Sequence, residues 1–402
     1  MAALLHLRTY LDWLIVSPAI PLAIYFSVST MLGVVAPYAG VEHPAYWIFG
    51  YLGICVASQL RRVQPRTHPI DLLFLIFLAV IVFSWIRTGQ TGGSRTLLLL
   101  LSNALIPWIA VRVFDEQDVA RFIRWTAVFG ITIAAAYLVA IPLLQHEARF
   151  ERVPFMETEA YGVIGPTVGL LAVITAIYLM REKLPLGWGA LPVCVIVIVH
   201  MGARGMLVSF IITLLLGCIL VDADVKRKAT VCAVVLAATV IALTLIPEAR
   251  LHHFLRLAHD IKAPERSIDD TIAIRIQFYR QALELFLSAP LTGLGAGRFG
   301  LHTSLNLELT TPHSTVFHIL SELGLLGAGP FAILNLLLLW LAYRARARTL
   351  SCVVAAGWAY FAVFDQISAN YLSSLRYYLF SGLLVTACYP PCSKNPDTST
   401  SH

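Results

Sequence analysis

The chain has 402 residues, of which 58% are hydrophobic and 13% are charged, and its formal net charge is +6. Soluble domains contain about 25% charged residues, so this composition, with a mean hydropathy of +0.77, excludes a soluble globular protein. The positive charge does not indicate nucleic-acid binding, because excess Lys and Arg are typical of the cytoplasmic loops of membrane proteins. The composition therefore predicts an all-α polytopic membrane protein.

Apolar runs long enough to cross a bilayer as a helix recur along the whole chain. We expect about twelve spans, at 13–36, 44–60, 69–87, 96–111, 121–144, 160–180, 186–201, 206–221, 229–247, 313–342, 350–365 and 371–389. They predict a transmembrane region over 1–247, a long loop over 248–312, a second transmembrane region over 313–389 and a tail over 390–402. The first run is too long for the apolar part of a signal peptide.

Short basic segments predict the orientation of these spans. They fall on one side when the spans alternate, and they are RRVQPR (61–66), RVFDEQDVARFIR (112–124), REK (181–183), KRK (226–228) and RARAR (344–348). Basic loops remain in the cytoplasm, so this side and both termini are expected to be cytoplasmic. The long loop between spans nine and ten then lies on the outer side. The seven cysteines avoid this loop, so no disulfide is expected.

The long loop contains a predicted helix over 271–287. Its apolar residues recur at helical spacing, and they are Ile272, Ile276, Tyr279, Leu283 and Phe286. Pro290 and the glycines of GLGAGRFG (293–300) should end the helix. An apolar face with arginines opposite suits the membrane surface, although packing on the other spans is equally compatible.

The next helix begins in the stretch TPHSTVFHILSELGLLG (311–327), where His313 follows a proline at the predicted helix start. From His313, positions 317, 320, 324 and 327 follow at helical spacing and hold Phe, Leu, Gly and Gly. Small residues let another helix approach closely, so we expect the face with His313 to point into the bundle. The alternative is a capping or interfacial histidine.

Two further polar residues lie deeper in the same stretch. Glu322 is an ionisable group inside a predicted span, and such groups are either functional or paired. A structural ion pair or hydrogen bond is the favoured interpretation. His318 lies off the stripe and is expected to be structural.

Four arginines are candidates for binding phosphate, because guanidinium makes bidentate contacts with it. Arg204 lies in HMGARG (200–205), a Gly-flanked turn between two predicted spans, and Arg275 and Arg280 lie on the loop helix. Arg298 lies in the Gly-rich segment. The competing interpretations are a side chain that extends to the lipid headgroups for Arg204 and a solvated surface for the other three.

The stretch at His313 resembles the family of O-antigen ligases. The family pattern is His, then Asn, Ser or Gln, nine residues, Gly, two residues, then Gly, Thr or Tyr; this chain has His313, Ser314, Gly324 and Gly327 at those places. Three further segments are similar to the family in the same order: MGARGMLVSF (201–210), IRIQFYRQALELF (274–286) and PLTGLGAGRF (290–299). The resemblance covers roughly residues 160–365.

This resemblance implies a metal-independent, inverting membrane glycosyltransferase without cofactor, in a bacterial inner membrane. Its partners would be membrane lipids, a glycan donor on undecaprenyl pyrophosphate, and a lipid A-core acceptor at the periplasmic face. His313 would be the general base or a phosphate ligand, and Arg204 and Arg275 would stabilise the pyrophosphate. The remaining carried-over roles are substrate binding for Arg280, Arg298 and Ser314, and structure for Glu322, Gly324 and Gly327.

Other functions share parts of this pattern. Wzy-type polysaccharide polymerases and protein O-oligosaccharyltransferases carry the same domain, and the sequence does not separate them from ligases. A transporter or flippase would also have many spans, but the longest loop here follows span nine rather than mid-chain, and no internal repeat is evident. A membrane scaffold without activity leaves the histidine and arginines unexplained.

Overall fold

The computed structural model describes residues 17–35, 52–60, 63–89, 93–147, 159–182, 185–201, 204–245, 271–303, 311–368, 371–372 and 374–393. Nearly all of these residues are helical, as the composition predicts. The first half contains a helical segment at 52–60 and α2 (Ala19–Val35), α4 (Pro69–Arg87), α5 (Gly93–Leu100), the π-helical turn η2 (Leu101–Leu105), α6 (Ile106–Arg112), α7 (Glu116–Glu147) and α9 (Glu159–Arg181). The second half contains α10 (Gly187–His200), α11 (Arg204–Leu220), α12 (Val225–Leu245), α14 (Thr271–Ser288), α15 (Phe299–His302), α16 (Thr315–Ala345), α17 (Thr349–Ser368) and α18 (Leu375–Cys388).

Five of these helices are long and apolar enough to cross a membrane. They cover Pro69–Arg87, Glu116–Val139, Val225–Thr244, Thr315–Ala345 and Thr349–Ile367. Shorter apolar helices cover Thr96–Arg112, Gly165–Arg181, Gly187–His200, Gly205–Leu220 and Leu375–Cys388. The chain is thus a polytopic helical membrane protein, while the number of twelve spans stays a prediction. The predicted spans 13–36 and 44–60 lie partly outside the described residues.

The start of α4 shows how local sequence sets a helix boundary. The side chain of His68 accepts the backbone N–H of Ile70, and Asp71 accepts the backbone N–H of His68, which forms a capping box. Pro69 occupies the first helical position, where its missing N–H is not needed. These local signals explain why this helix covers the range that the hydropathy predicts.

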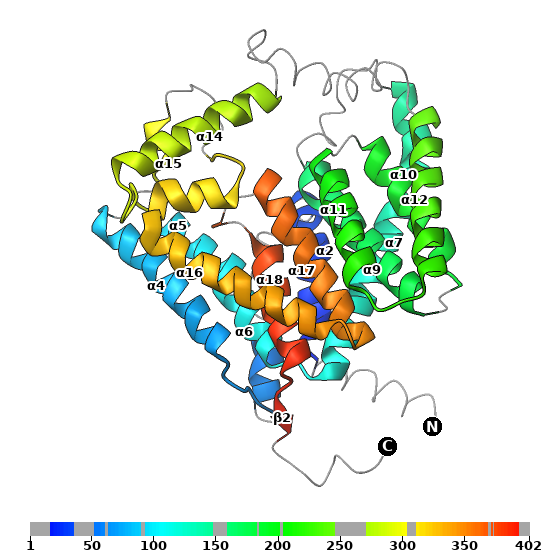
Figure 1. Ribbon diagram of the computed structural model, residues 1–402, viewed down its shortest axis with the longest axis horizontal. Helices are drawn as coiled ribbons and strands as arrows, with labels where there is room; N and C mark the ends of the chain where they lie inside the picture. The colour runs from blue at the N-terminus through cyan, green and yellow to red at the C-terminus, as the bar shows by residue number, and fades with distance from the viewer. Residues whose placement is uncertain are drawn as a thin grey trace.

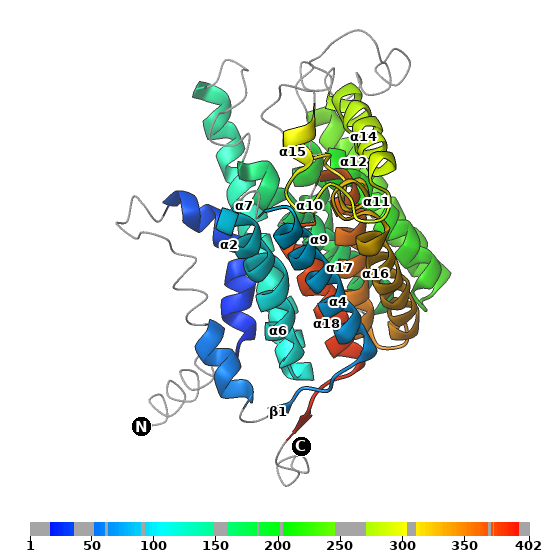
Figure 2. The ribbon, with the colours of Figure 1, turned by 90° about the vertical axis from the view of Figure 1, so that its left-hand side faces the viewer.

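Helices α17 and α18 stand between two larger groups of helices (Figure 1). On one side α4 packs on α16, and α14 crosses α16 near one end. On the other side α7, α9, α10, α11 and α12 pack together, and α17 contacts both α16 and the pair α9 and α11. Figure 2 shows that most helices run between the same two ends of the molecule. Helix α17 therefore links the two groups.

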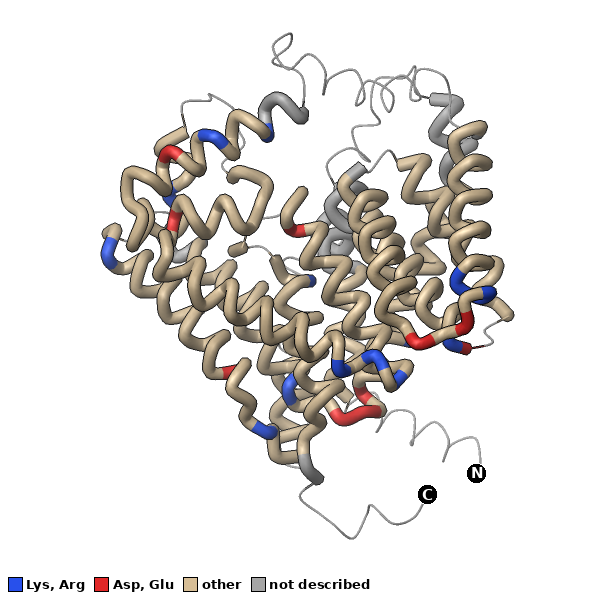
Figure 3. The backbone as a smooth tube through the Cα atoms, viewed as in Figure 1, with Lys and Arg blue, Asp and Glu red and all other residues tan. Residues whose placement is uncertain are grey.

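The basic segments gather at one of these ends (Figure 3), as the loop alternation predicts. Arg181 donates hydrogen bonds to the carbonyls of Arg346 and Ala347, and Arg227 donates to the carbonyl of Arg181. Arg112 is buried there and pairs with the carboxylate of Asp71 at 2.9 Å. We call this the basic end. The short strands β1 (Val63–Gln64) and β2 (Cys392–Ser393) pair antiparallel at this end.

Candidate functional site

His313 lies at the end of the helices opposite to the basic end, in the short segment before α16. It is outside the helix, because α16 begins at Thr315 and Ser314 is its extended N-cap residue. The prediction that the helix starts at residue 313 is therefore wrong by two residues. Among the described residues His313 is the one non-glycine residue with a positive φ, 53°. This conformation costs about 1–3 kcal/mol, and residues held in it concentrate at functional sites.

The segment with His313 is anchored to the end of α17. The hydroxyl of Thr315 donates to the carbonyl of Asp365 at 3.2 Å, and the N–H of Val316 donates to the side chain of Gln366 at 3.2 Å. Ser314 is 4% exposed and makes no side-chain capping bond. His313 itself is half-buried. The imidazole is thus carried on a fixed backbone next to α17.

Helix α14, which carries Arg275, packs against the first turn of α16. One turn further along α14, the ring of Tyr279 stacks on Phe317, with centroids 4.7 Å apart and planes 13° from parallel. Burial raises the pKa of Tyr279, and the positive charge of Arg275 acts in the opposite direction. Arg275 is half-buried. The fold therefore places the helix with Arg275 against the helix that follows His313, and a joint role of the two residues stays a prediction.

Helix α14 buries two residues that lie outside the apolar face that the sequence predicts. Phe278 and Ala282 are fully buried and pack with Phe299, whereas Ile276 and Leu283 of the predicted face are 39% and 46% exposed. The predicted helix is confirmed, and its predicted apolar face is divided: Tyr279 packs on Phe317, while Ile276 and Leu283 stay exposed and suit the membrane surface. Ile272 lies among the residues whose side chains are not described.

Helix α16 is broken at Gly324, whose φ of 60° is not helical. The expected continuous stripe of residues from 313 to 327 is therefore wrong. The Gly-rich segment 290–299 lies against the break, and a Cβ on Gly324 would be 2.6 Å from the carbonyl carbon of Leu291. A Cβ on Gly327 would meet Leu323 on the preceding turn. The glycines thus accommodate a break and a loop, rather than the approach of another helix.

The Gly-rich segment also satisfies the backbone groups that the break exposes. Four hydrogen bonds join the two segments: Leu325 N–H to Pro290 C=O at 2.8 Å, Leu326 N–H to Leu291 C=O at 3.0 Å, Leu294 N–H to Ser321 C=O at 3.0 Å and Gly295 N–H to Glu322 C=O at 2.8 Å. Unpaired backbone groups are costly in an apolar environment. The two motifs of the family resemblance therefore form one structural unit.

The side chain of Glu322 holds the Gly-rich segment against the broken part of α16. Its side chain is 1% exposed and accepts the N–H groups of Gly297 and Phe299, both at 2.7 Å. It also accepts the hydroxyl of Tyr371 at 2.6 Å, and His318 Nε2 lies 3.1 Å from Oε1. The carboxylate thus ties the Gly-rich segment to α16 and to the connection between α17 and α18.

Arg298 and Arg280 occupy different environments. Arg298 donates to the carbonyl of Thr88, at the end of α4, at 3.1 Å. Arg280 is exposed on α14. Arg87, which the sequence did not single out, donates to the hydroxyl of Thr292 at 2.7 Å and to the carbonyl of Gly293 at 2.8 Å. The structure therefore gives Arg298 a contact with the scaffold, and substrate binding by Arg280 and Arg298 stays a prediction.

Arg204 is the first residue of α11. Its side chain and residues 202–203 of the preceding turn lie outside the described residues. Helix α11 packs on α17 and α9, and it begins at the end of the molecule opposite to the basic end (Figure 1). The contribution of Arg204 stays a prediction.

Three polar residues of this region were missed by the sequence reasoning: Tyr371, Asp365 and Arg376. Tyr371 holds Glu322, and Asp365 lies under the first turn of α16 and interacts electrostatically with Arg376. Asp365 is an ionisable residue at the end of a predicted span, and Arg376 lies inside the next one. Ionisable groups in such positions are candidate functional residues, so this signal was present.

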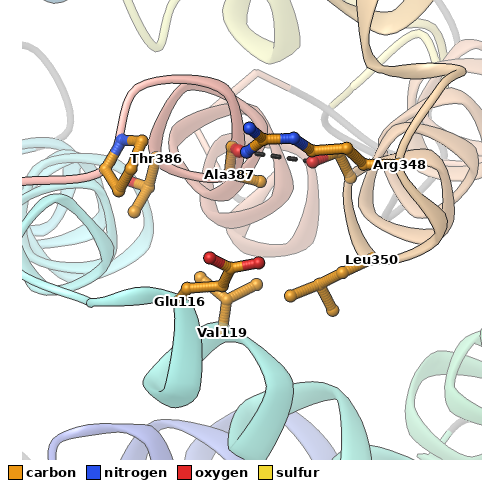
Figure 4. A pocket seen from close by; sticks show the side chains of 8 residues that line it. Glu116, Val119, Arg348, Leu350, Thr386 and Ala387 are labelled. Carbon is orange, nitrogen blue, oxygen red and sulfur yellow. Dashed lines mark hydrogen bonds between the residues drawn. The ribbon is translucent and has the colours of Figure 1, made fainter. Parts of the chain in front are cut away.

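A small pocket lies at the basic end (Figure 4) and is lined by Glu116, Val119, Arg348, Leu350, Ser351, Thr386, Ala387 and Pro390. Ser351 donates to the carbonyl of Ala387 beside it at 3.2 Å. Because it lies at the opposite end of the helices from His313, this pocket is separate from the candidate site. Within the described ranges, no group of three or more His, Cys, Asp or Glu residues could hold a metal ion.

Comparison with known proteins identifies the domain that contains these residues. Residues 188–332 match the family model described as O-antigen ligase, named Wzy_C. No curated protein matches the chain. The matched range begins in α10, contains Arg204, Arg275 and His313, and ends after the break at Gly324. Residues 188–332 therefore form a domain of the O-antigen ligase family.

Proposed function

We propose that this membrane enzyme is an inverting glycosyltransferase of the ligase type. It transfers a glycan from undecaprenyl pyrophosphate to a sugar hydroxyl of lipid A-core, without a metal ion or cofactor. The observation that carries the proposal is the family match, whose range contains every candidate arginine and His313. The left-handed backbone at His313 supports it, because such strain at an otherwise unremarkable position is typical of functional sites.

In this reaction the acceptor oxygen attacks the anomeric carbon while the bond from that carbon to pyrophosphate breaks. The departing pyrophosphate keeps the electron pair and gains negative charge, which Arg204 and Arg275 stabilise as fixed cations. His313 takes the proton of the attacking hydroxyl, a task suited to a group with an ordinary pKa near 6.5. The apolar helices accommodate the lipid part of the donor.

The active site faces the periplasm of a bacterial inner membrane in this proposal. The basic end of the molecule is cytoplasmic according to the positive-inside rule, and α16, which begins two residues after His313, starts at the other end. Donor and acceptor therefore meet the enzyme at the outer surface of the membrane.

The experiment is a transfer assay with the purified protein in detergent. It contains undecaprenyl-pyrophosphate-linked glycan and lipid A-core, with and without EDTA, and the lipid A-core is followed by its shift on a gel. Equal product in both conditions supports metal-independent ligation. Loss of product with EDTA contradicts the metal independence alone.

The other products of the same assay separate the related functions. Longer lipid-linked glycans without a shifted lipid A-core identify a Wzy-type polymerase, and glycan on a protein acceptor identifies a protein O-oligosaccharyltransferase. If a folded preparation gives none of these products, the glycosyltransferase proposal is wrong and transport of lipid-linked glycans becomes the next assay.

A further inference from the structure

Asp365 is a buried carboxylate with an open acceptor atom. It lies near the end of α17, is 4% exposed, and its Oδ2 atom has no hydrogen-bond partner among the described residues. Nearly all buried polar atoms in proteins have a partner, so an open carboxylate oxygen in this position needs an explanation. A bound ligand that donates a hydrogen bond to Oδ2 is such an explanation.

Two neighbours on the following segment hold this carboxyl group in place. Ser374, 3% exposed, donates a hydrogen bond to Asp365, and Arg376 on the first turn of α18 attracts it electrostatically. Arg376 is itself surrounded by aromatic residues, with its guanidinium 6.0 Å from the centroid of Phe26 and close to Tyr360. Ser374 and Arg376 thus interact with the carboxyl group, while Oδ2 has no hydrogen-bond partner among the described residues.

The position of Asp365 connects it to the proposed active site. Its own carbonyl accepts the hydroxyl of Thr315 at 3.2 Å, and Thr315 is two residues from His313. On the other side, the connection between α17 and α18 is held by Tyr371, which donates to Glu322. The carboxyl group is therefore at the outer end of the helices, beside the segment that carries the proposed base.

A carboxylate selects one part of the substrates. Its oxygens accept hydrogen bonds, so it pairs with hydroxyl groups. Both the donor and the acceptor of the proposed reaction carry sugar hydroxyls. We infer that Asp365 binds a sugar hydroxyl of one of the two glycan substrates through Oδ2, with Ser374 and Arg376 as positioning residues. This inference rests on the proposed function.

The test compares steady-state kinetics of Asp365→Asn with the wild type, varying the donor and the acceptor separately. The matched control is Asp118→Asn, a buried carboxylate at the basic end whose two oxygens are already bonded to Ser17 at 2.7 Å and to Gln59 at 3.1 Å. For Asp365→Asn we expect the KM of one substrate to rise about 10–100-fold, the range for a hydrogen bond to a charged group. The KM of the other substrate should stay unchanged, and Asp118→Asn should change neither.

The results distinguish a donor hydroxyl from an acceptor hydroxyl, and they separate failure of this inference from failure of the proposed function. A rise in the donor KM assigns the hydroxyl to the donor sugar, and a rise in the acceptor KM assigns it to the acceptor. If both KM values match the wild type in an active, folded protein, the inference is wrong while the proposed function stands. If the wild type forms no product, the proposed function itself fails.

Ser374→Ala keeps the test decisive if Asp365→Asn does not fold. This change removes only the hydrogen bond that positions the carboxyl group, so the same KM should rise by a smaller factor. An unchanged KM in Ser374→Ala would then overturn the inference. Arg376→Lys should show a partial effect on the same KM, because lysine keeps the charge but loses the planar geometry.

Discussion

At the scale of single residues, backbone conformation and side-chain chemistry can be separated at His313. Its φ of 53° lies in a region that asparagine tolerates better than most residues. Asparagine therefore keeps the local backbone and removes the imidazole. An alanine substitution changes both properties at once, so the asparagine variant is the sharper probe of the proposed base.

We expect His313→Asn to lower the rate of glycan transfer about 10²–10⁴-fold, the range for a lost general base, with an unchanged melting temperature. The matched control is His302→Asn, an exposed histidine on α15 in the same part of the molecule. Transfer at the wild-type rate by His313→Asn would remove His313 from the mechanism.

Arg275 gives a second prediction at this scale. Arg275→Ala should lower transfer about 10²–10³-fold, as expected for the loss of one group that stabilises transition-state charge. Arg275→Lys should recover part of the rate, since it restores the charge without the bidentate geometry. Gln277→Ala, at an exposed position on the same helix, controls for changes in α14. If Gln277→Ala is as slow as Arg275→Ala, the effect belongs to the helix and not to the guanidinium.

At the scale of elements, the break in α16 and the Gly-rich segment depend on each other. The break exposes backbone groups that the segment 290–295 pairs, and the segment can approach because Gly293 and Gly324 have no side chain. A Cβ on Gly293 would lie 2.3 Å from the carbonyl carbon of Glu322. Disturbing either glycine should therefore disturb both motifs.

Gly324→Ala should destabilise the protein, because alanine disfavours a φ of 60° and its Cβ would meet the backbone of Leu291 at 2.6 Å. We expect a fall of several degrees in melting temperature in detergent, together with loss of transfer. Gly189→Ala is the control, since Gly189 is helical and has open space around it; there alanine should be neutral or slightly stabilising. Equal melting temperatures for the two variants would contradict the proposed role of the break.

Tyr371→Phe tests the bond that joins this unit to α17 and α18. The change removes the 2.6 Å hydrogen bond to Glu322, which should lower stability by about 1.5–3 kcal/mol, the range for a hydrogen bond to a charged group. Tyr343→Phe, 49% exposed on α16, should have no measurable effect. Thermal unfolding followed by fluorescence-detected size exclusion would compare the two, and a Tyr371→Phe protein as stable as Tyr343→Phe would show that the bond contributes nothing.

At the scale of the whole molecule, the two ends of the bundle differ in charge and in contents. One end gathers the basic segments, and the other carries the His313 segment, the Gly-rich segment and α14. The predicted orientation in the membrane depends on this asymmetry of charge.

Cysteine labelling in intact cells tests that orientation. In a variant without the seven native cysteines, an impermeant maleimide should label Ser288→Cys at the end of α14 and should not label Ala347→Cys at the basic end. Both positions are exposed, so accessibility within the protein is not the difference between them. Opening the cells should make Ala347→Cys reactive. The reverse pattern would place the candidate site in the cytoplasm and contradict the proposed donor and acceptor geometry.

The sequence by itself determined the class of protein and the positions of most helices, because a run of apolar residues is a local property that adds up along the chain. For example, the predicted range 69–87 coincides with α4, and 160–180 lies within α9 by one residue at each end. It also determined the family resemblance at His313, Ser314, Gly324 and Gly327, which depends only on spacing.

The tertiary structure decided how those residues are used. His313 leaves the helix, Gly324 breaks it, and α14 turns Phe278 rather than Leu283 toward its partner. Asp365 and Arg376 become neighbours although a turn of uncharged residues separates them in the chain. Each of these outcomes depends on hydrogen bonds and contacts between different elements, which no local sum of hydropathy or propensity contains.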